Sequence, residues 1–220
     1  MERMRIRRPG AATLVLGWVA LAWMAPPAAA AAEAIFEAGD HCVAYRTVKD
    51  IFFGFDAEIV GRSCEVSASV AVEPDGAGSR VVVAVPVKSL DSGNPLRDWK
   101  VADLLGAKLE PELRFVSDPL DATALRADVA DGRFVLPGTL QFAGRQYAID
   151  FPLELIEAGE RREIAGHLAT TFAAFDVEVP TVAGGLVARP HEELELVVRL
   201  DLERVQGLAE WAAAAAAEQP

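Results

Sequence analysis

Stretches of alternating apolar and polar residues recur along most of the chain. In the clearest one, every second residue from Leu194 to Leu202 is Leu or Val. Such a period of two places alternate side chains on opposite faces of a pleated strand. Tight-turn pairs such as Asp131-Gly132 and Ala143-Gly144 separate further stretches, as in β-hairpins. The pattern predicts about eight to ten short strands and therefore an all-β fold, either an antiparallel barrel or a sandwich.

One segment departs from this pattern. Between a strand that ends near Leu90 and another that begins at Leu113, apolar residues recur at helical spacing. This spacing predicts about two turns of a short helix lying over a hydrophobic surface. A barrel with a single helical lid between two strands is the expected arrangement. The apolar residues of the lid are Leu96, Trp99, Val101, Leu104 and Leu105.

Residues 1–32 have the composition of a secretory signal peptide. Four arginines precede an apolar run from Ala11 to Ala25, and small residues follow from Ala28 to Ala32. The run is too short for a comfortable membrane span. We therefore expect cleavage between Ala28 and Glu33, no stable membrane span afterwards, and a periplasmic or secreted protein. The barrel domain is expected over residues 33–206, and an Ala-rich C-terminal tail over residues 207–220. This tail is either a short helix on the barrel end or, as we favour, a frayed segment.

The charge balance excludes some partners. The chain has 21 basic and 33 acidic residues, a formal net charge of −12. Without residues 1–32, which hold four Arg and one Glu, 17 basic and 32 acidic residues remain, a balance of −15. Such a surface repels the phosphate backbone of nucleic acid, so a nucleic-acid partner is not expected.

Cys42 and Cys64 are the only cysteines. An exported chain meets an oxidising compartment, in which such a pair can form a disulfide. If one strand lies between the two cysteines, however, they are separated by roughly 9 to 10 Å, beyond comfortable disulfide reach. A bridge and two buried free thiols therefore both remain open at this point.

The sequence offers no constellation of catalytic or metal-binding residues. His41, His167 and His191 stand singly, without the spacing of a metal site. There is no nucleophile elbow, P-loop or Gly-rich dinucleotide turn. The pair Arg97-Asp98 is interpreted as an ion pair that fixes the first turn of the helix, with a contact to a ligand head group as the alternative. We expect no enzyme activity, no metal and no cofactor.

The run from Val87 to Asn94 is a strand that ends in a Ser-Gly-Asn turn, and Arg97-Asp98 follows it. This stretch is similar to the most diagnostic one of the YceI-like family of bacterial periplasmic proteins. The resemblance extends from about Cys42 to Arg204. One departure is Trp99-Lys100, which stands where such proteins usually carry His-Leu. Further matching features are Gly54-Phe55 with Gly61, Pro111 with Phe115, and Gly138-Thr139-Leu140.

The resemblance implies a lipocalin-like antiparallel β-barrel with a long apolar pocket for a polyisoprenoid. A barrel of about eight strands either fills with side chains or holds one slender ligand. The expected inward residues are mostly small and apolar, which leaves volume for an isoprenoid or quinone-type lipid. The alternative is a solid barrel that binds a partner protein through its acidic surface, and whether the chain forms a homodimer stays open. The expected wall residues are Phe53, Phe55, Phe115, Phe134, Leu140 and Phe142, and the expected lid residues are Trp99, Leu104 and Leu105.

Overall fold

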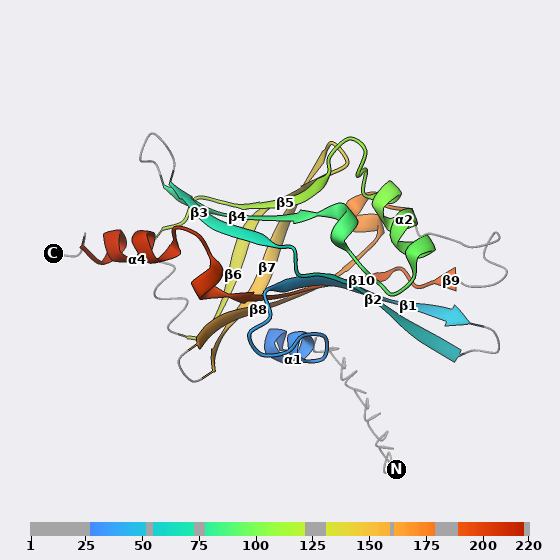
Figure 1. Ribbon diagram of the computed structural model, residues 1–220, viewed down its shortest axis with the longest axis horizontal. Coiled ribbons are helices and arrows are strands. Elements are labelled where there is room, and N and C mark those ends of the chain that lie inside the picture. The colour runs from blue at the N-terminus through green and yellow to red at the C-terminus, as the bar shows by residue number, and fades with distance from the viewer. Residues whose placement is uncertain are drawn as a thin grey trace, which may run out of the picture.

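The computed structural model describes residues 27–51, 55–72, 78–121, 131–158, 161–178 and 189–217 (Figure 1). Its ten strands form one antiparallel sheet in the order β2-β1-β10-β8-β7-β6-β5-β4-β3, with β9 pairing β1 off this path. The predicted all-β antiparallel class is confirmed, whereas the strand expected over residues 122–130 lies outside the described residues. The strands are β1 (Cys42–Ile51), β2 (Phe55–Ser63), β3 (Ser67–Val72), β4 (Ser79–Pro86), β5 (Glu112–Ser117), β6 (Arg133–Phe142), β7 (Arg145–Ala158), β8 (Arg161–Thr171), β9 (Arg189–Pro190) and β10 (Glu193–Asp201).

The sheet curls into a barrel whose edge strands, β2 and β3, form no ladder with each other in the described chain. Each edge strand instead forms an isolated β-bridge with a residue outside the strands. Arg62 of β2 pairs with Asp91, and Ser69 of β3 pairs with Gln206. Both bridging residues lie next to helical segments, so loops rather than a strand ladder occupy the seam of the barrel.

The predicted helix is α2 (Pro95–Leu104), and its start follows from the sequence. The Asn94 side chain accepts hydrogen bonds from the backbone N–H groups of Leu96 and Arg97, and proline occupies the first helical position. Asparagine caps and first-turn prolines both favour helix starts. In the described parts of the chain, one-turn 3-10 helices follow β4, β8 and β10: η1 (Val87–Ser89), η2 (Ala173–Phe175) and η4 (Leu202–Arg204).

Of the two forms expected for the C-terminal residues, the structure has the helix: residues 208–217 form α4 (Leu208–Ala217) and not the favoured frayed tail. Alanine has the highest helix propensity, and Leu208 and Trp211 give the helix an apolar contact with the barrel end. No helix of the described residues is long and apolar enough to cross a membrane.

A further helix that was not predicted, α1 (Ala28–Glu33), packs on the outside of the barrel against β7, β8 and β10 (Figure 1). Ala31 and Ala32 are buried there with Phe36, above Ala165 and Val197 of the sheet. The segment expected to hold the cleavage site is therefore part of a packed layer on the barrel.

Cys42 and Cys64 form a disulfide with Cα atoms 4.1 Å apart. The assumption of a strand between them is wrong, because β1 and β2 are direct neighbours. The ladder pairs Val43 with Ser63, which places Cys64, immediately after β2, beside Cys42 at the start of β1.

Candidate ligand-binding pocket

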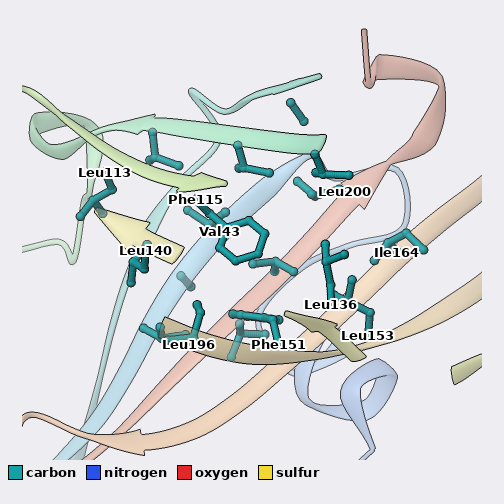
Figure 2. Close-up of a pocket in the computed structure, with 18 of the residues that line it drawn as sticks. Val43, Leu113, Phe115, Leu136, Leu140, Phe151, Leu153, Ile164, Leu196 and Leu200 are labelled. Atoms are coloured by element: carbon teal, nitrogen blue, oxygen red, sulfur yellow. The ribbon is translucent and has the colours of Figure 1, made fainter. Parts of the chain in front are cut away.

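A cavity of about 770 Å³ occupies the interior of the barrel (Figure 2). Alternate residues of the strands supply its wall, such as Val81, Val83 and Val85 of β4. Figure 2 shows side chains from several strands pointing into one common space. The volume is within the range of about 300 to 1,000 Å³ that is usual for small-molecule pockets. The barrel is therefore hollow, and its lining is almost entirely hydrocarbon.

The interior stays open because the packed clusters of apolar residues lie on the outer face of the sheet and at one end of the cavity. One cluster lies beneath α1 on the outer face of the sheet. Another joins Phe142, Tyr147 and Phe175 near the α2 end, with ring centroids 5.1 to 6.1 Å apart. Away from these clusters the wall carries small residues such as Ala68, which do not reach across the barrel.

Six of the nine residues predicted to contact a ligand line this cavity. Phe53 lies outside the described residues, and Phe55 belongs to β2 but its side chain is not among those described. The six lining residues are Leu104, Leu105, Phe115, Phe134, Leu140 and Phe142.

The structure corrects the prediction for Trp99, which does not line the cavity. Trp99 and Leu96 are 61% and 72% exposed, because positions three apart share one face of a helix. Arg97, Val101 and Leu104 occupy the opposite face and line the cavity. The apolar residues of α2, which were predicted to share one face, are divided between two faces of the helix.

Several lining residues were not among the predicted wall residues. Phe151, in the alternating strand β7, and Leu194, in β10, had the right pattern, but alternation does not tell which face of a strand is inward. Leu208 and Trp211 of α4 also line the cavity. No local sequence signal reveals them, because their position depends on where α4 packs.

Two glycines of the motifs make room for aromatic rings on the wall. A Cβ atom at Gly138 would lie 2.7 Å from Cζ of Phe115 and 2.5 Å from the carbonyl oxygen of Val116. A Cβ atom at Gly61 would lie 2.2 Å from Cε1 of Tyr45. These glycines allow both rings to lie against the neighbouring strand.

Among the described residues, polar groups line the cavity only near its two ends. Tyr45, Thr47 and Arg97 lie at the α2 end, and Arg162 and Glu203 lie at the α4 end. Thr47 is satisfied, because its hydroxyl donates to the carbonyl oxygen of Glu193 at 2.9 Å.

The interpretation of Arg97-Asp98 as a direct ion pair is also corrected. Both side chains bind Ser92 instead. Arg97 Nε donates to Ser92 Oγ at 2.7 Å and its Nη2 donates to the Ser92 carbonyl at 2.9 Å. The Asp98 carboxylate accepts from the Ser92 backbone N–H at 3.1 Å and from the Ser92 hydroxyl. Ser92 thereby fixes the first turn of α2 to the preceding loop.

None of the three histidines lines the cavity. His167 is buried outside it, with Nε2 2.8 Å from Oε2 of Glu195. His191 is paired with Asp50 at 2.9 Å, and the nearest ligand atoms of His191, Asp50 and Asp56 lie within 4.8 Å of one another. These two histidines therefore have acidic partners, which the sequence spacing did not reveal.

The model of the YceI-like domain family matches residues 32–201 of this chain. BcnA of Burkholderia cenocepacia is a structural neighbour with a TM-score of 0.53 and 20% identity, covering 73% of this chain and 95% of that one. A polyisoprenoid-binding domain from Saccharophagus degradans has a TM-score of 0.52 and 16% identity, covering 72% and 92%. A mutant CJ YCEI protein with a monobromobimane guest has a TM-score of 0.51 and 17% identity, covering 77% and 93%. No curated protein matches the sequence.

Proposed function

The chain belongs to the YceI-like family, and from this premise we propose that it is a non-enzymatic protein that binds a long amphiphilic isoprenoid, such as a quinone-type lipid, in its barrel. The hollow apolar interior of about 770 Å³ is the observation that carries the proposal. It also argues against the alternative of a solid barrel that acts only through its acidic surface. The Saccharophagus degradans neighbour, described as polyisoprenoid-binding, supports the same ligand class.

The shape of the cavity favours a chain over a compact molecule. Its lining extends from Leu104 and Leu105 in the α2 region to Leu208 and Trp211 of α4, and these two helices lie at different ends of the barrel (Figure 1). Burial of hydrocarbon contributes about 0.8 kcal/mol per CH₂ group. An isoprenoid chain therefore gains affinity along the whole length of the barrel without any hydrogen bond.

We place the protein in the periplasm of a bacterium or outside the cell. The composition of residues 1–32 supports export. The Cys42–Cys64 disulfide supports it independently, since such bridges persist in oxidising compartments and are rare in the cytosol.

Native mass spectrometry of the mature protein, purified from a bacterial periplasm, tests the proposal. We expect a stoichiometric hydrophobic adduct, and organic extraction followed by mass analysis would give its ligand class. A protein that carries no adduct and also fails to take up an added long-chain quinone would contradict the proposal. That result would favour the alternative, a protein that binds a partner protein through its acidic surface.

A further inference from the structure

Arg97 presents hydrogen-bond donors to an otherwise apolar cavity. Its side chain lines the α2 end and is held in place by its two hydrogen bonds to Ser92, at 2.7 and 2.9 Å. A guanidinium carries five N–H donors, and in the described chain the remaining donors of Arg97 have no acceptor. Because Ser92 fixes the planar group, these donors keep one orientation at the cavity surface.

Tyr45 places a second donor at the same end. Its hydroxyl is buried and has no hydrogen-bond partner among the described residues. A buried polar group without a partner destabilises the protein, so a ligand oxygen that accepts from it removes that penalty. Tyr45 lies opposite Gly61 in the β1–β2 ladder, and the missing Cβ of Gly61 allows the ring to lie there.

The surroundings keep the Tyr45 hydroxyl protonated. Burial is the main cause that raises the pKa of Tyr45, while the positive charge of Arg97 acts in the opposite direction and the charge of Asp98 acts with burial. The Ser92 side chain also lies near the hydroxyl and lowers this pKa, but the two groups form no hydrogen bond. Tyr45, Arg97 and Asp98 therefore form one electrostatic group at the α2 end.

The ligand oxygen that suits this group is an uncharged acceptor. Arg97 and Tyr45 both offer protons to an acceptor in the cavity. The Asp98 carboxylate, held on Ser92, places a negative charge beside them and disfavours a second carboxylate. We propose that Arg97 and Tyr45 bind the carbonyl oxygen of a ketone, quinone or amide head group, while the hydrocarbon chain extends towards α4. This inference rests on the proposed function of the cavity.

Competition binding tests the site with ligands that differ in the head group. Geranylgeranylacetone, geranylgeranoic acid and the hydrocarbon phytane would each displace the uncharged fluorescent probe N-phenyl-1-naphthylamine from the mature protein. We expect the ketone to bind more tightly than the acid and the hydrocarbon. Arg97→Met and Tyr45→Phe should each weaken ketone binding about tenfold or more, the loss of one strong hydrogen bond, and leave phytane unchanged.

Arg114→Met is the matched control, because Arg114 lies on β5, is exposed and does not line the cavity. It should change the affinity for none of the ligands. The inference is overturned if Arg97→Met and Tyr45→Phe weaken all ligands equally, if the acid binds more tightly than the ketone, or if Arg162→Met at the α4 end removes the ketone preference instead. A wild-type protein that binds neither the probe nor any of the three ligands would contradict the proposed function itself.

Discussion

Glu163 and Arg199 form an ion pair that solvent does not reach. Their side chains are 0% and 4% exposed, and Arg199 Nε donates to Oε2 of Glu163 at 2.6 Å. The other carboxylate oxygen accepts from the backbone N–H of Gly39 at 2.7 Å. The pair thus joins β8 and β10 to the chain that follows α1. Removing one partner of a buried pair is costly because the remaining charge stays buried.

Glu163→Gln is therefore expected to lower the free energy of unfolding by about 3 kcal/mol, measured by urea denaturation. Asp103→Asn is the control, because Asp103 pairs with Lys108 at 3.1 Å on the surface and such pairs contribute about 1 kcal/mol or less. Equal losses for the two variants would show that the Glu163–Arg199 pair does not fix α1 to the barrel.

Two histidines give the stability opposite dependences on pH. Burial, and then the charge of Arg204, lower the pKa of His41, while Asp201 acts in the opposite direction. The contribution of His41 to stability is present above its unfolded pKa of about 6.5 and is lost as pH falls below that value. The hydrogen bond to Asp50 is the main cause that raises the pKa of His191, which nearby carboxylates raise further. Its contribution is present below about pH 6.5 and is lost as pH rises through the raised pKa.

Thermal unfolding between pH 5 and 8 separates the two effects. His41→Gln should reduce the fall in unfolding temperature at acidic pH and leave the unfolding temperature at alkaline pH unchanged. His191→Asn, the reciprocal control, should do the reverse. If the loss of stability at low pH persists in His41→Gln, a group other than His41 causes it.

Helix α1 connects the proposed cleavage of the signal peptide with the stability of the barrel. Ala31 and Ala32 are 3% and 0% exposed in the layer over β8 and β10. A cut directly before Glu33 would remove both of them, whereas a cut after Ala30 would keep them. We expect the mature chain to begin at Ala31, as intact mass would show. A chain that begins at Glu33 should be about 1 to 2 kcal/mol less stable than one that begins at Ala31, the scale of two buried methyl groups.

The controls for this prediction are built from the same residues. Ala31→Ser and Ala32→Ser in the longer chain should reproduce part of the loss, since each places a hydroxyl in an apolar site. Equal unfolding temperatures for the two chain lengths would show that α1 contributes nothing to the barrel.

Local sequence rules predicted the individual strands and helices better than they predicted which of them lie next to one another. The alternation along β10 and the Asn94 cap of α2 follow from backbone geometry and nearby hydrogen bonds, so they could be predicted. The orientation of Trp99 could not, because α2 has apolar residues on two faces and only the packed barrel decides which face is inward. The Cys42–Cys64 bridge depended on whether β1 and β2 are neighbours, which is a property of the sheet rather than of either strand.

The hollow interior is a property of the whole molecule. Small inward residues such as Ala68 and Val83 make space, and that space persists only because the aromatic side chains pack together at one end and α1 packs outside. Periodicity in the sequence gives neither of these placements. The family motifs predicted a pocket through resemblance, but the Tyr45–Arg97 group at its end became visible only in three dimensions.

Blocking the cavity should separate ligand binding from folding. Val83 lines the wall beside Phe115, its partner in the β4–β5 ladder, and Val83→Trp would place an indole across the space that the chain of a ligand needs. Because the cavity already has room, we expect the variant to fold with an unfolding temperature close to that of the wild type. A ligand at 100 times its Kd should stabilise the wild type by about 2.7 kcal/mol and the variant by much less.

Val82→Trp is the control, because Val82 is the next residue of the same strand and does not line the cavity. It should keep the full ligand-induced rise in unfolding temperature, measured with geranylgeranylacetone by calorimetry. If both variants keep that rise, the ligand binds outside the barrel. If only Val83→Trp loses it, the interior of the barrel is the binding site, since the two substitutions add the same side chain to opposite faces of one strand.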